Sequence, residues 1–133
     1  MEPAHHEEDV RKQIERLGPW FQNIHLPGGI ETCSDHYLGD YPTFKWRLLE
    51  GALPRDLHGW TALDIGCNAG FYTFELAKRG AAVTGMDSNP HYLRQARWVA
   101  QQLGMAERVR LVERSVYELA RSHEHYDLVL FMG

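Results

Sequence analysis

The chain has 133 residues, of which 44% are hydrophobic and 24% are charged, a balance typical of one globular domain. Its formal net charge of −4 gives no basic footprint for nucleic acid, and no apolar stretch approaches the roughly 20 residues that a membrane helix needs. Two separated cysteines, Cys33 and Cys67, and the lack of a recognisable signal peptide favour a reducing cytoplasm.

Residues 1–55 are expected to form an extension of helical and irregular segments that covers a ligand pocket. An amphipathic helix is predicted between an acidic run at 7–9 and Gly18, because three apolar residues recur at helical spacing: Val10, Ile14 and Leu17. The segment 19–42 carries Gly, Pro and aromatic residues without a period, and we expect it to be irregular. A second helix is indicated by four apolar residues: Phe44, Leu48, Leu49 and Leu53.

From residue 56 onward, strands and helices alternate. Strands are predicted over 60–65, 81–86, 108–113 and 126–132, and helices over 71–79, 90–103 and 116–122. Ser88 or Asn89 ahead of Pro90 is a strong helix start, since a capping side chain precedes a proline. This interleaving implies parallel strands with right-handed crossovers, and therefore an α/β sandwich.

The loop that follows the first of these strands is the most informative part of the sequence. It has the spacing Asp-x-Gly-x-Asn-x-Gly, which begins at Asp64 and ends at Gly70. Gly66 and Gly70 permit positive φ and the close approach of a ligand to the main chain, and Asn68 tolerates the left-handed region. The loop therefore predicts a site for a nucleotide-like cofactor, although it meets the dinucleotide fingerprint Gly-x-Gly-x-x-Gly only loosely.

Two segments carry a resemblance to a known family. Residues 63–71, Leu-Asp-Ile-Gly-Cys-Asn-Ala-Gly-Phe, resemble the first motif of class I S-adenosylmethionine-dependent methyltransferases, and residues 85–90, Gly-Met-Asp-Ser-Asn-Pro, resemble the second. The flanking residues 44–49 and 131–133 are most similar to the branch that contains the bacterial tRNA wobble-uridine carboxymethyltransferase. The resemblance covers roughly residues 40–133.

The resemblance implies a Rossmann-like fold whose first four parallel strands lie in the spatial order 3-2-1-4. The strand predicted at 126–132 is nearly all apolar and no helix follows it, so we expect a domain truncated after the fourth strand. Residues 56–133 are then the N-terminal half of the S-adenosylmethionine-binding domain, and residues 1–55 are its helical extension.

The resemblance also implies which residues bind the cofactor. Asp64 and the loop backbone would face its methionine end, and Asp87, at the carboxyl end of the second strand, would accept hydrogen bonds from both ribose hydroxyls. Ser115 stands where many relatives carry an acid that accepts from the adenine amino group, and the Val116 N–H would donate to the ring. The thioether of Met132 would pack near the sulfonium.

Lys45 bears on the kind of cofactor. In the carboxymethyltransferase a lysine between two tryptophans contacts a carboxylated cofactor, and Phe44-Lys45-Trp46 occupies the matching place. An expected upstream tryptophan is missing, so ordinary S-adenosylmethionine is the first reading and the carboxylated variant the second. The residues expected to bind the cofactor are Lys45, Asp64, Gly66, Cys67, Asn68, Gly70, Asp87, Ser88, Asn89, Ser115, Val116 and Met132.

No catalytic residue is assigned, because a sulfonium methyl is electrophilic by itself and a general base, where needed, commonly follows the fourth strand. The acceptor is expected to be a small molecule or a nucleic-acid base; tRNA is compatible with the resemblance but unsupported by charge. Carboxymethyl transfer to a tRNA wobble uridine and a non-catalytic truncated relative are the alternatives. No metal is predicted, since the histidines at 5–6 and 123–125 show no complete structural-site spacing.

Overall fold

The computed structural model describes residues 3–132, in which helices and strands alternate in the second half of the chain. The helices are α1 (Pro3–Leu17), α2 (Tyr41–Leu49), α3 (Phe71–Lys78), α4 (Pro90–Gln102) and α5 (Val116–Ala120), with short 3-10 turns η1 (Pro27–Gly29) and η2 (Glu50–Ala52). The strands are β1 (His25–Leu26), β2 (Ile30–Glu31), β3 (Thr61–Ile65), β4 (Ala82–Asp87), β5 (Val109–Glu113) and β6 (Leu128–Phe131).

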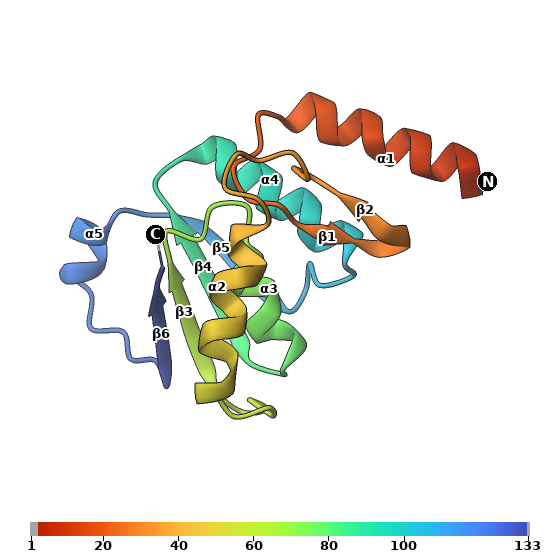
Figure 1. Cartoon of the computed structure of the whole chain (residues 1–133). Coiled ribbons are helices and arrows are strands. Elements are labelled where there is room, and N and C mark those ends of the chain that lie inside the picture. The colour runs from red at the N-terminus through yellow and green to blue at the C-terminus, as the bar shows by residue number, and fades with distance from the viewer. Residues whose placement is uncertain (1–2, 133) are drawn as a thin grey trace.

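Four strands form one parallel sheet in the order β5-β4-β3-β6 (Figure 1). This is the predicted order 3-2-1-4, which is therefore confirmed. The register pairs Ile65 with Met86 and Asp87 with Glu113, so the carboxyl ends of the three strands β3, β4 and β5 lie at the same edge of the sheet. That edge is where open α/β sheets bind their ligands.

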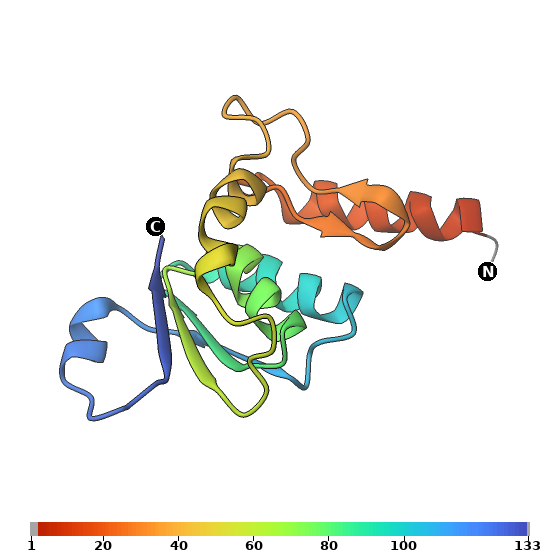
Figure 2. The same ribbon diagram turned by 60° about the horizontal axis from the view of Figure 1, so that its bottom comes forward.

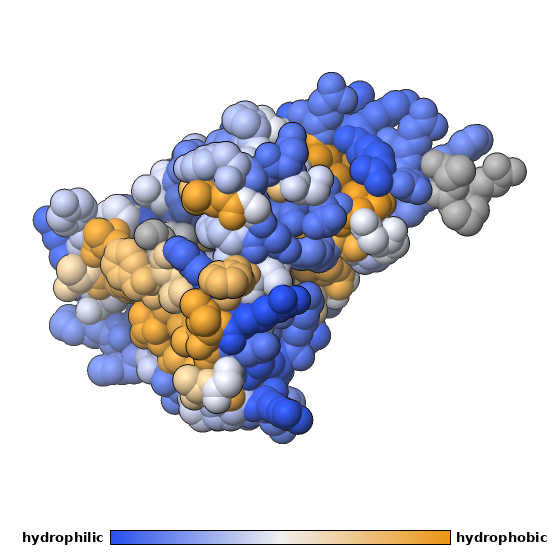
Figure 3. Space-filling model, viewed as in Figure 1, coloured by the Kyte–Doolittle hydropathy of each residue, from blue (hydrophilic) through white to orange (hydrophobic). Residues whose placement is uncertain are grey.

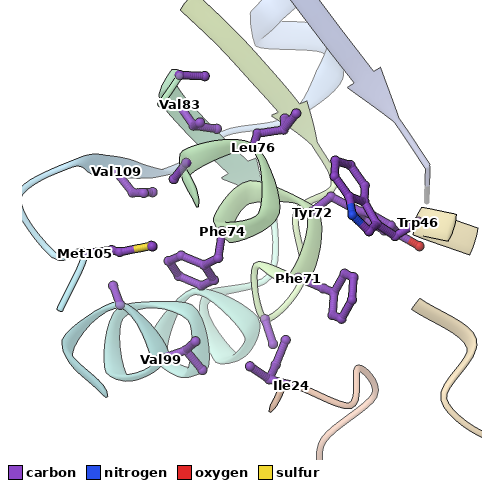
Figure 4. Packing of buried hydrophobic residues seen from close by; sticks show 14 of the residues in the cluster. Ile24, Trp46, Phe71, Tyr72, Phe74, Leu76, Val83, Val99, Met105 and Val109 are labelled. Carbon is purple, nitrogen blue, oxygen red and sulfur yellow. The ribbon is translucent and has the colours of Figure 1, made fainter. Parts of the chain in front are cut away.

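Helices α3 and α4 pack on one face of the sheet and enclose the main hydrophobic core. Phe74 projects from α3 toward α4, which carries the fully buried Val99, and the fully buried Leu76 lies on another side of α3, toward the sheet (Figure 4). Trp46 of α2 lies against Tyr72 of α3, with ring centroids 6.5 Å apart. These contacts join the extension to the sheet domain through one continuous core.

The opposite face of the sheet is covered less completely in the described part of the chain. A small cluster centres on Leu63, Ile65 and Met86, with side chains of β5 and α5 packed against it. On β6 the side chains of Val129 and Phe131 are 49% and 68% exposed. Figure 3 shows apolar surface gathered over β6, beside α2. Within residues 3–132, β6 pairs with β3 and has no strand on its other side.

The extension differs from the prediction in one respect. The segment expected to be irregular contains a short antiparallel pair, in which His25 pairs with Glu31 and Leu26 with Ile30 across η1. Two-residue strands are too short to show a period of two, which is why the sequence pattern missed them. Helix α1 ends at Leu17 before Gly18 as predicted, and it begins earlier than predicted, at Pro3.

The extension lies over α3 and α4, at the end of the sheet where the parallel strands end (Figure 2). The buried side chain of Gln95 on α4 donates to the carbonyl oxygens of Leu17 at 2.8 Å and Pro19 at 2.9 Å. Trp20 packs edge-on against Trp98, with ring centroids 6.0 Å apart. The extension is thereby fixed against α4. In residues 3–132, no helix combines the length and apolar character that crossing a bilayer requires.

Candidate functional site

The loop between β3 and α3 has the backbone conformation that its sequence predicts. Gly66 and Asn68 adopt positive φ values of 67° and 55°. The Cys67 N–H donates to the Met86 carbonyl oxygen at 2.8 Å, which ties the loop to the end of β4. A Cβ on Gly66 would meet no atom within 4 Å, so this position faces open space.

Asp87 is held by backbone N–H groups on both sides. Its Oδ2 accepts from the Asn68 N–H and its Oδ1 from the Asn89 N–H, each at 2.9 Å. A carboxylate oxygen has two lone pairs, so each oxygen retains the capacity for one further hydrogen bond. Asp87 therefore presents two adjacent acceptors at the tip of β4, which is the pattern that a vicinal diol requires.

Two cavities meet at Gly66. The first, which we call the extension-side cavity, has a volume of about 200 Å³ and is lined by Phe21, Gln22, Leu38, Tyr41, Lys45, Gly66, Asn68, Tyr72 and Met132. The second, the strand-end cavity, has a volume of about 220 Å³ and is lined by Ile65, Gly66, Met86, Asp87, Ser88, Arg114, Ser115, Val116, Tyr117 and Phe131. Together they have the size of a small-molecule site, for which roughly 300–1,000 Å³ is usual.

Eight of the twelve residues expected to bind a cofactor line these cavities: Lys45, Gly66, Asn68, Asp87, Ser88, Ser115, Val116 and Met132. They come from α2, the ends of β4 and β6, the loop after β3, and the start of α5. The structure thus gathers residues from five separate segments around one space. The other four, Asp64, Cys67, Gly70 and Asn89, line neither cavity.

Asp64 was expected to face the ligand, and the structure places it elsewhere. Its side chain is 1% exposed, and its Oδ2 accepts from the Thr73 hydroxyl at 2.7 Å. Burial raises the pKa of Asp64 to about 7, although the hydrogen bonds from Thr73 oppose the shift. The carboxyl group is therefore buried and hydrogen-bonded to α3.

The remaining three residues shape the loop and the next helix. Cys67 is fully buried. A Cβ on Gly70 would come within 2.5 Å of the Phe74 ring, so only glycine fits where the loop enters α3. The Asn89 side chain accepts from the His91 N–H at 2.9 Å and caps α4, as the sequence predicted.

Ser115 combines a cavity position with a structural role. Its hydroxyl accepts from the Glu118 N–H at 3.3 Å, and the Glu118 side chain accepts from the Ser115 N–H, which makes a capping box at the start of α5. The hydroxyl keeps its proton and one lone pair for another partner. Arg114 beside it pairs with Glu124, and this contact lowers the pKa of Glu124 to about 2.

Among the residues of the extension-side cavity that sequence reasoning missed are Gln22 and Tyr72. Gln22 is 4% exposed, and its Oε1 accepts from the Phe71 N–H, the first of α3, at 3.0 Å. The Tyr72 hydroxyl is buried without a hydrogen-bond partner in the described chain, and burial, aided by Asp64, raises its pKa to about 12. Gln22 lies in an aperiodic segment and Tyr72 in a helix that reads as core, so neither gave a signal.

Within residues 3–132, a group of potential metal ligands occurs away from the histidine-rich stretches considered from sequence: His25, Glu31 and Asp40. The His25 ring lies between the two carboxylates, with Nε2 at 2.6 Å from Asp40 Oδ2 and Nδ1 at 3.7 Å from Glu31 Oε1. Because different ring nitrogens face the two acids, the group has the geometry of a polar link between β1, β2 and the start of α2. The absence of a metal stays a prediction.

Comparisons with known proteins agree with this geometry. A family described as "Methyltransferase domain" matches residues 62–133. The chain is 29% identical over 131 residues, 96% of its length, to the tRNA U34 carboxymethyltransferase of Klebsiella pneumoniae subsp. pneumoniae, and covers 37% of that protein. It is 35% identical over 79 residues, 59% of its length, to the ubiquinone biosynthesis O-methyltransferase of a Methylobacterium species, and covers 31% of it.

Among solved structures, the N-terminal domain of EvdMO1 with S-adenosylhomocysteine (SAH) bound is 27% identical and has a TM-score of 0.69. The match covers 92% of this chain and 52% of that one. The similarity includes the extension as well as the sheet, since it extends over nearly the whole chain. The chain spans about a third of the length of the two curated relatives.

Proposed function

Because the chain belongs to the class I S-adenosylmethionine-dependent methyltransferases, we propose that the two cavities that meet at Gly66 hold one molecule of S-adenosylmethionine, whose methyl group the whole protein transfers to an acceptor. The Asp87 carboxylate carries this proposal. Backbone N–H groups fix both of its oxygens, and both retain a lone pair toward the strand-end cavity.

The strand-end cavity suits the nucleoside. Asp87 offers the two acceptors that the ribose hydroxyls need. The Val116 N–H, the first of α5, has no partner within the helix and suits an acceptor nitrogen of the adenine ring. The Ser115 hydroxyl retains the capacity for one contact with the adenine amino group. The side chains of Ile65 and Met86 supply apolar walls.

The extension-side cavity suits the amino-acid end of the cofactor. The Gln22 side chain is anchored through its oxygen, so its amide nitrogen is the group that remains for a ligand. The buried Tyr72 hydroxyl lacks a partner in the described chain, and a hydrogen bond to a ligand would satisfy it. Gly66 leaves room for the chain between the two ends, since any side chain there would fill the junction.

When bound, the cofactor supplies an electrophilic methyl group on a sulfonium that leaves as a neutral thioether. The chain's part is to orient the two reacting groups and to exclude water. Phe21, Tyr41 and Met132 wall the extension-side cavity and supply apolar surface around the reacting carbon. No residue is assigned as a general base.

A second candidate function is carboxymethyl transfer, which Lys45 favours. Lys45 lines the extension-side cavity, and its Nζ lies 5.7 Å from the centre of the Tyr41 ring. A cation there suits a carboxylated cofactor. Under this alternative, Lys45→Met lowers the affinity for the carboxylated cofactor about tenfold relative to ordinary S-adenosylmethionine, while the exposed control Lys12→Met changes neither. Equal effects on both cofactors would leave ordinary methyl transfer as the better account.

The location and the acceptor are proposals as well. We infer a cytoplasmic protein from its two free cysteines. A tRNA acceptor has support from the carboxymethyltransferase relative but none from a net charge of −4. The alternative to a methyltransferase is a relative that binds the cofactor without catalysing methyl transfer.

Calorimetric titration with SAH tests the proposed cofactor directly, with NADH as the competitor that a dehydrogenase would prefer. We expect one molecule of SAH per chain and weaker or no binding of NADH. A folded protein that binds NADH more tightly than SAH, or that does not bind SAH, would contradict the proposal. Binding of SAH without methyl transfer to any acceptor would favour the non-catalytic alternative.

A further inference from the structure

A third cavity continues the extension-side cavity along α2. Its volume is about 350 Å³, and we call it the α2 groove; it is lined by Leu38, Asp40, Tyr41, Thr43, Phe44 and Arg47. Leu38 and Tyr41 line both spaces, so the groove adjoins the region assigned to the reacting end of the cofactor. A molecule in the groove therefore lies beside the methyl group that the proposed function transfers.

Aromatic rings dominate one wall of this combined space. Phe21 packs edge-on against Tyr41, with ring centroids 5.5 Å apart, and also against His36, at 5.2 Å. Phe44 follows Tyr41 by three residues on the same face of α2, and 66% of it is exposed. Exposed aromatic surface beside a binding cavity favours a flat ring as the occupant.

The cationic group of the groove is the Arg47 guanidinium. Within residues 3–132, Arg47 forms neither a salt bridge nor a side-chain hydrogen bond, so its guanidinium remains for a ligand. The groove also has an acid, Asp40: its Oδ2 lies 2.6 Å from His25 Nε2, and its Oδ1 is buried without a hydrogen-bond partner in the described chain. A guanidinium prefers a planar anion such as a carboxylate.

We propose that the α2 groove takes the methyl acceptor, and that this acceptor is a small planar aromatic molecule with an anionic group, its ring against Tyr41 and Phe44 and its anion at Arg47. The inference rests on the proposed function, because it names the acceptor of that same site. The net charge of −4 disfavours a nucleic acid, and the groove has room for a molecule of one ring.

The test measures binding of 4-hydroxybenzoate to the whole protein saturated with SAH. Two probes each remove one feature, since phenol lacks the anion and trans-4-hydroxycyclohexanecarboxylate lacks the flat ring. We expect 4-hydroxybenzoate to bind about tenfold more tightly than either probe. D-fucose and a single-stranded RNA oligonucleotide serve as probes of the two other acceptor classes.

Two variants assign the effects to residues. Arg47→Gln is expected to lower the affinity for the two carboxylates about tenfold and to leave the affinity for phenol unchanged. Phe44→Leu is expected to lower the affinity for the two aromatic probes, 4-hydroxybenzoate and phenol, about threefold to tenfold. The matched controls are Arg55→Gln and Leu48→Ala, which change exposed residues outside the groove; Leu48 is 76% exposed on the same helix as Phe44. Neither control should change the affinity for any of the probes.

Binding of SAH in each variant separates the two proposals. If SAH binds normally but trans-4-hydroxycyclohexanecarboxylate, D-fucose or RNA binds as tightly as 4-hydroxybenzoate, the acceptor inference is overturned and the proposed function stands. An Arg47→Gln variant with unchanged affinity for 4-hydroxybenzoate also overturns it. Failure of the wild-type protein to bind SAH overturns both.

Discussion

The backbone N–H of Asn68 donates to the Asp87 carboxylate at 2.9 Å and so joins the loop after β3 to the tip of β4. The bond spans two neighbouring parallel strands and holds Asn68 in the left-handed region, with φ of 55°. The Asn68 Oδ1 in turn accepts from the Ala69 N–H at 2.7 Å. One pair of residues thereby sets both the shape of the loop and the orientation of the acid.

The left-handed Asn68 predicts a ranking of substitutions. Asn68→Gly should change the free energy of unfolding little, because glycine adopts positive φ without steric cost. Asn68→Ala should destabilise the chain by about 1–2 kcal/mol, the usual cost of this conformation for a residue with a Cβ. Urea unfolding of both variants measures the difference. Equal stability of the two variants would show that the strain is relieved by movement of the loop.

Gly66 predicts a loss of binding that is separate from stability. Gly66→Ala places a methyl group at the junction of the two cavities, so we expect at least a tenfold loss of SAH affinity, which corresponds to about 1.4 kcal/mol. The matched control is Gly104→Ala, which has nearly the same φ, 66° against 67°, and equally open surroundings. Both variants should lose similar stability in urea. Equal SAH affinities would mean that no ligand crosses Gly66.

Asp64 predicts a pH dependence of stability. Its pKa in the folded chain is raised to about 7 from an ordinary 3.8, so the folded state keeps a proton that the unfolded state loses. The unfolding free energy should therefore fall as pH rises from about 4 to about 7, by roughly 4 kcal/mol at most, and then level off.

Comparison with Asp64→Asn isolates this effect, since asparagine does not titrate and its carbonyl oxygen can still accept from the Thr73 hydroxyl. Urea unfolding of both proteins at about pH 5 and about pH 8 gives the difference in stability. The free energy of unfolding of the wild type, relative to that of the variant, should be lower at the higher pH. A difference that stays constant, or that grows in favour of the wild type, would show that Asp64 is ionised in the folded chain.

Much of the fold could be predicted because the relevant signals are local. The alternation of apolar runs with capped helices located β3 to β6 within one or two residues at most boundaries, and Asn89 ahead of Pro90 marked the start of α4 correctly. The pair β1–β2 was missed, because strands of two residues are too short to show an alternating pattern in the sequence.

Sequence reasoning could place those residues of the candidate site whose positions depend on the backbone. Gly66, Asn68 and Asp87 mark strand ends and unusual φ values, which residue type reveals. The position of Asp64 was not predictable, because its burial depends on the Thr73 hydroxyl, nine residues later on α3. Gln22 was missed for a similar reason, since its partner, the Phe71 N–H, lies 49 residues further along the chain.

The central claim is that Asp87 accepts hydrogen bonds from both ribose hydroxyls, and a double-mutant cycle tests it most directly. Calorimetry measures the affinities of wild type and Asp87→Asn for SAH and for its 2′,3′-dideoxy analogue, with Asp56→Asn as a control at a carboxylate that likewise accepts from a loop N–H, that of His58. Removing the hydroxyls should cost the wild type and the control at least tenfold in affinity and the Asp87→Asn protein much less. An equal loss in all three proteins would contradict the account, because the ribose would then bind without Asp87.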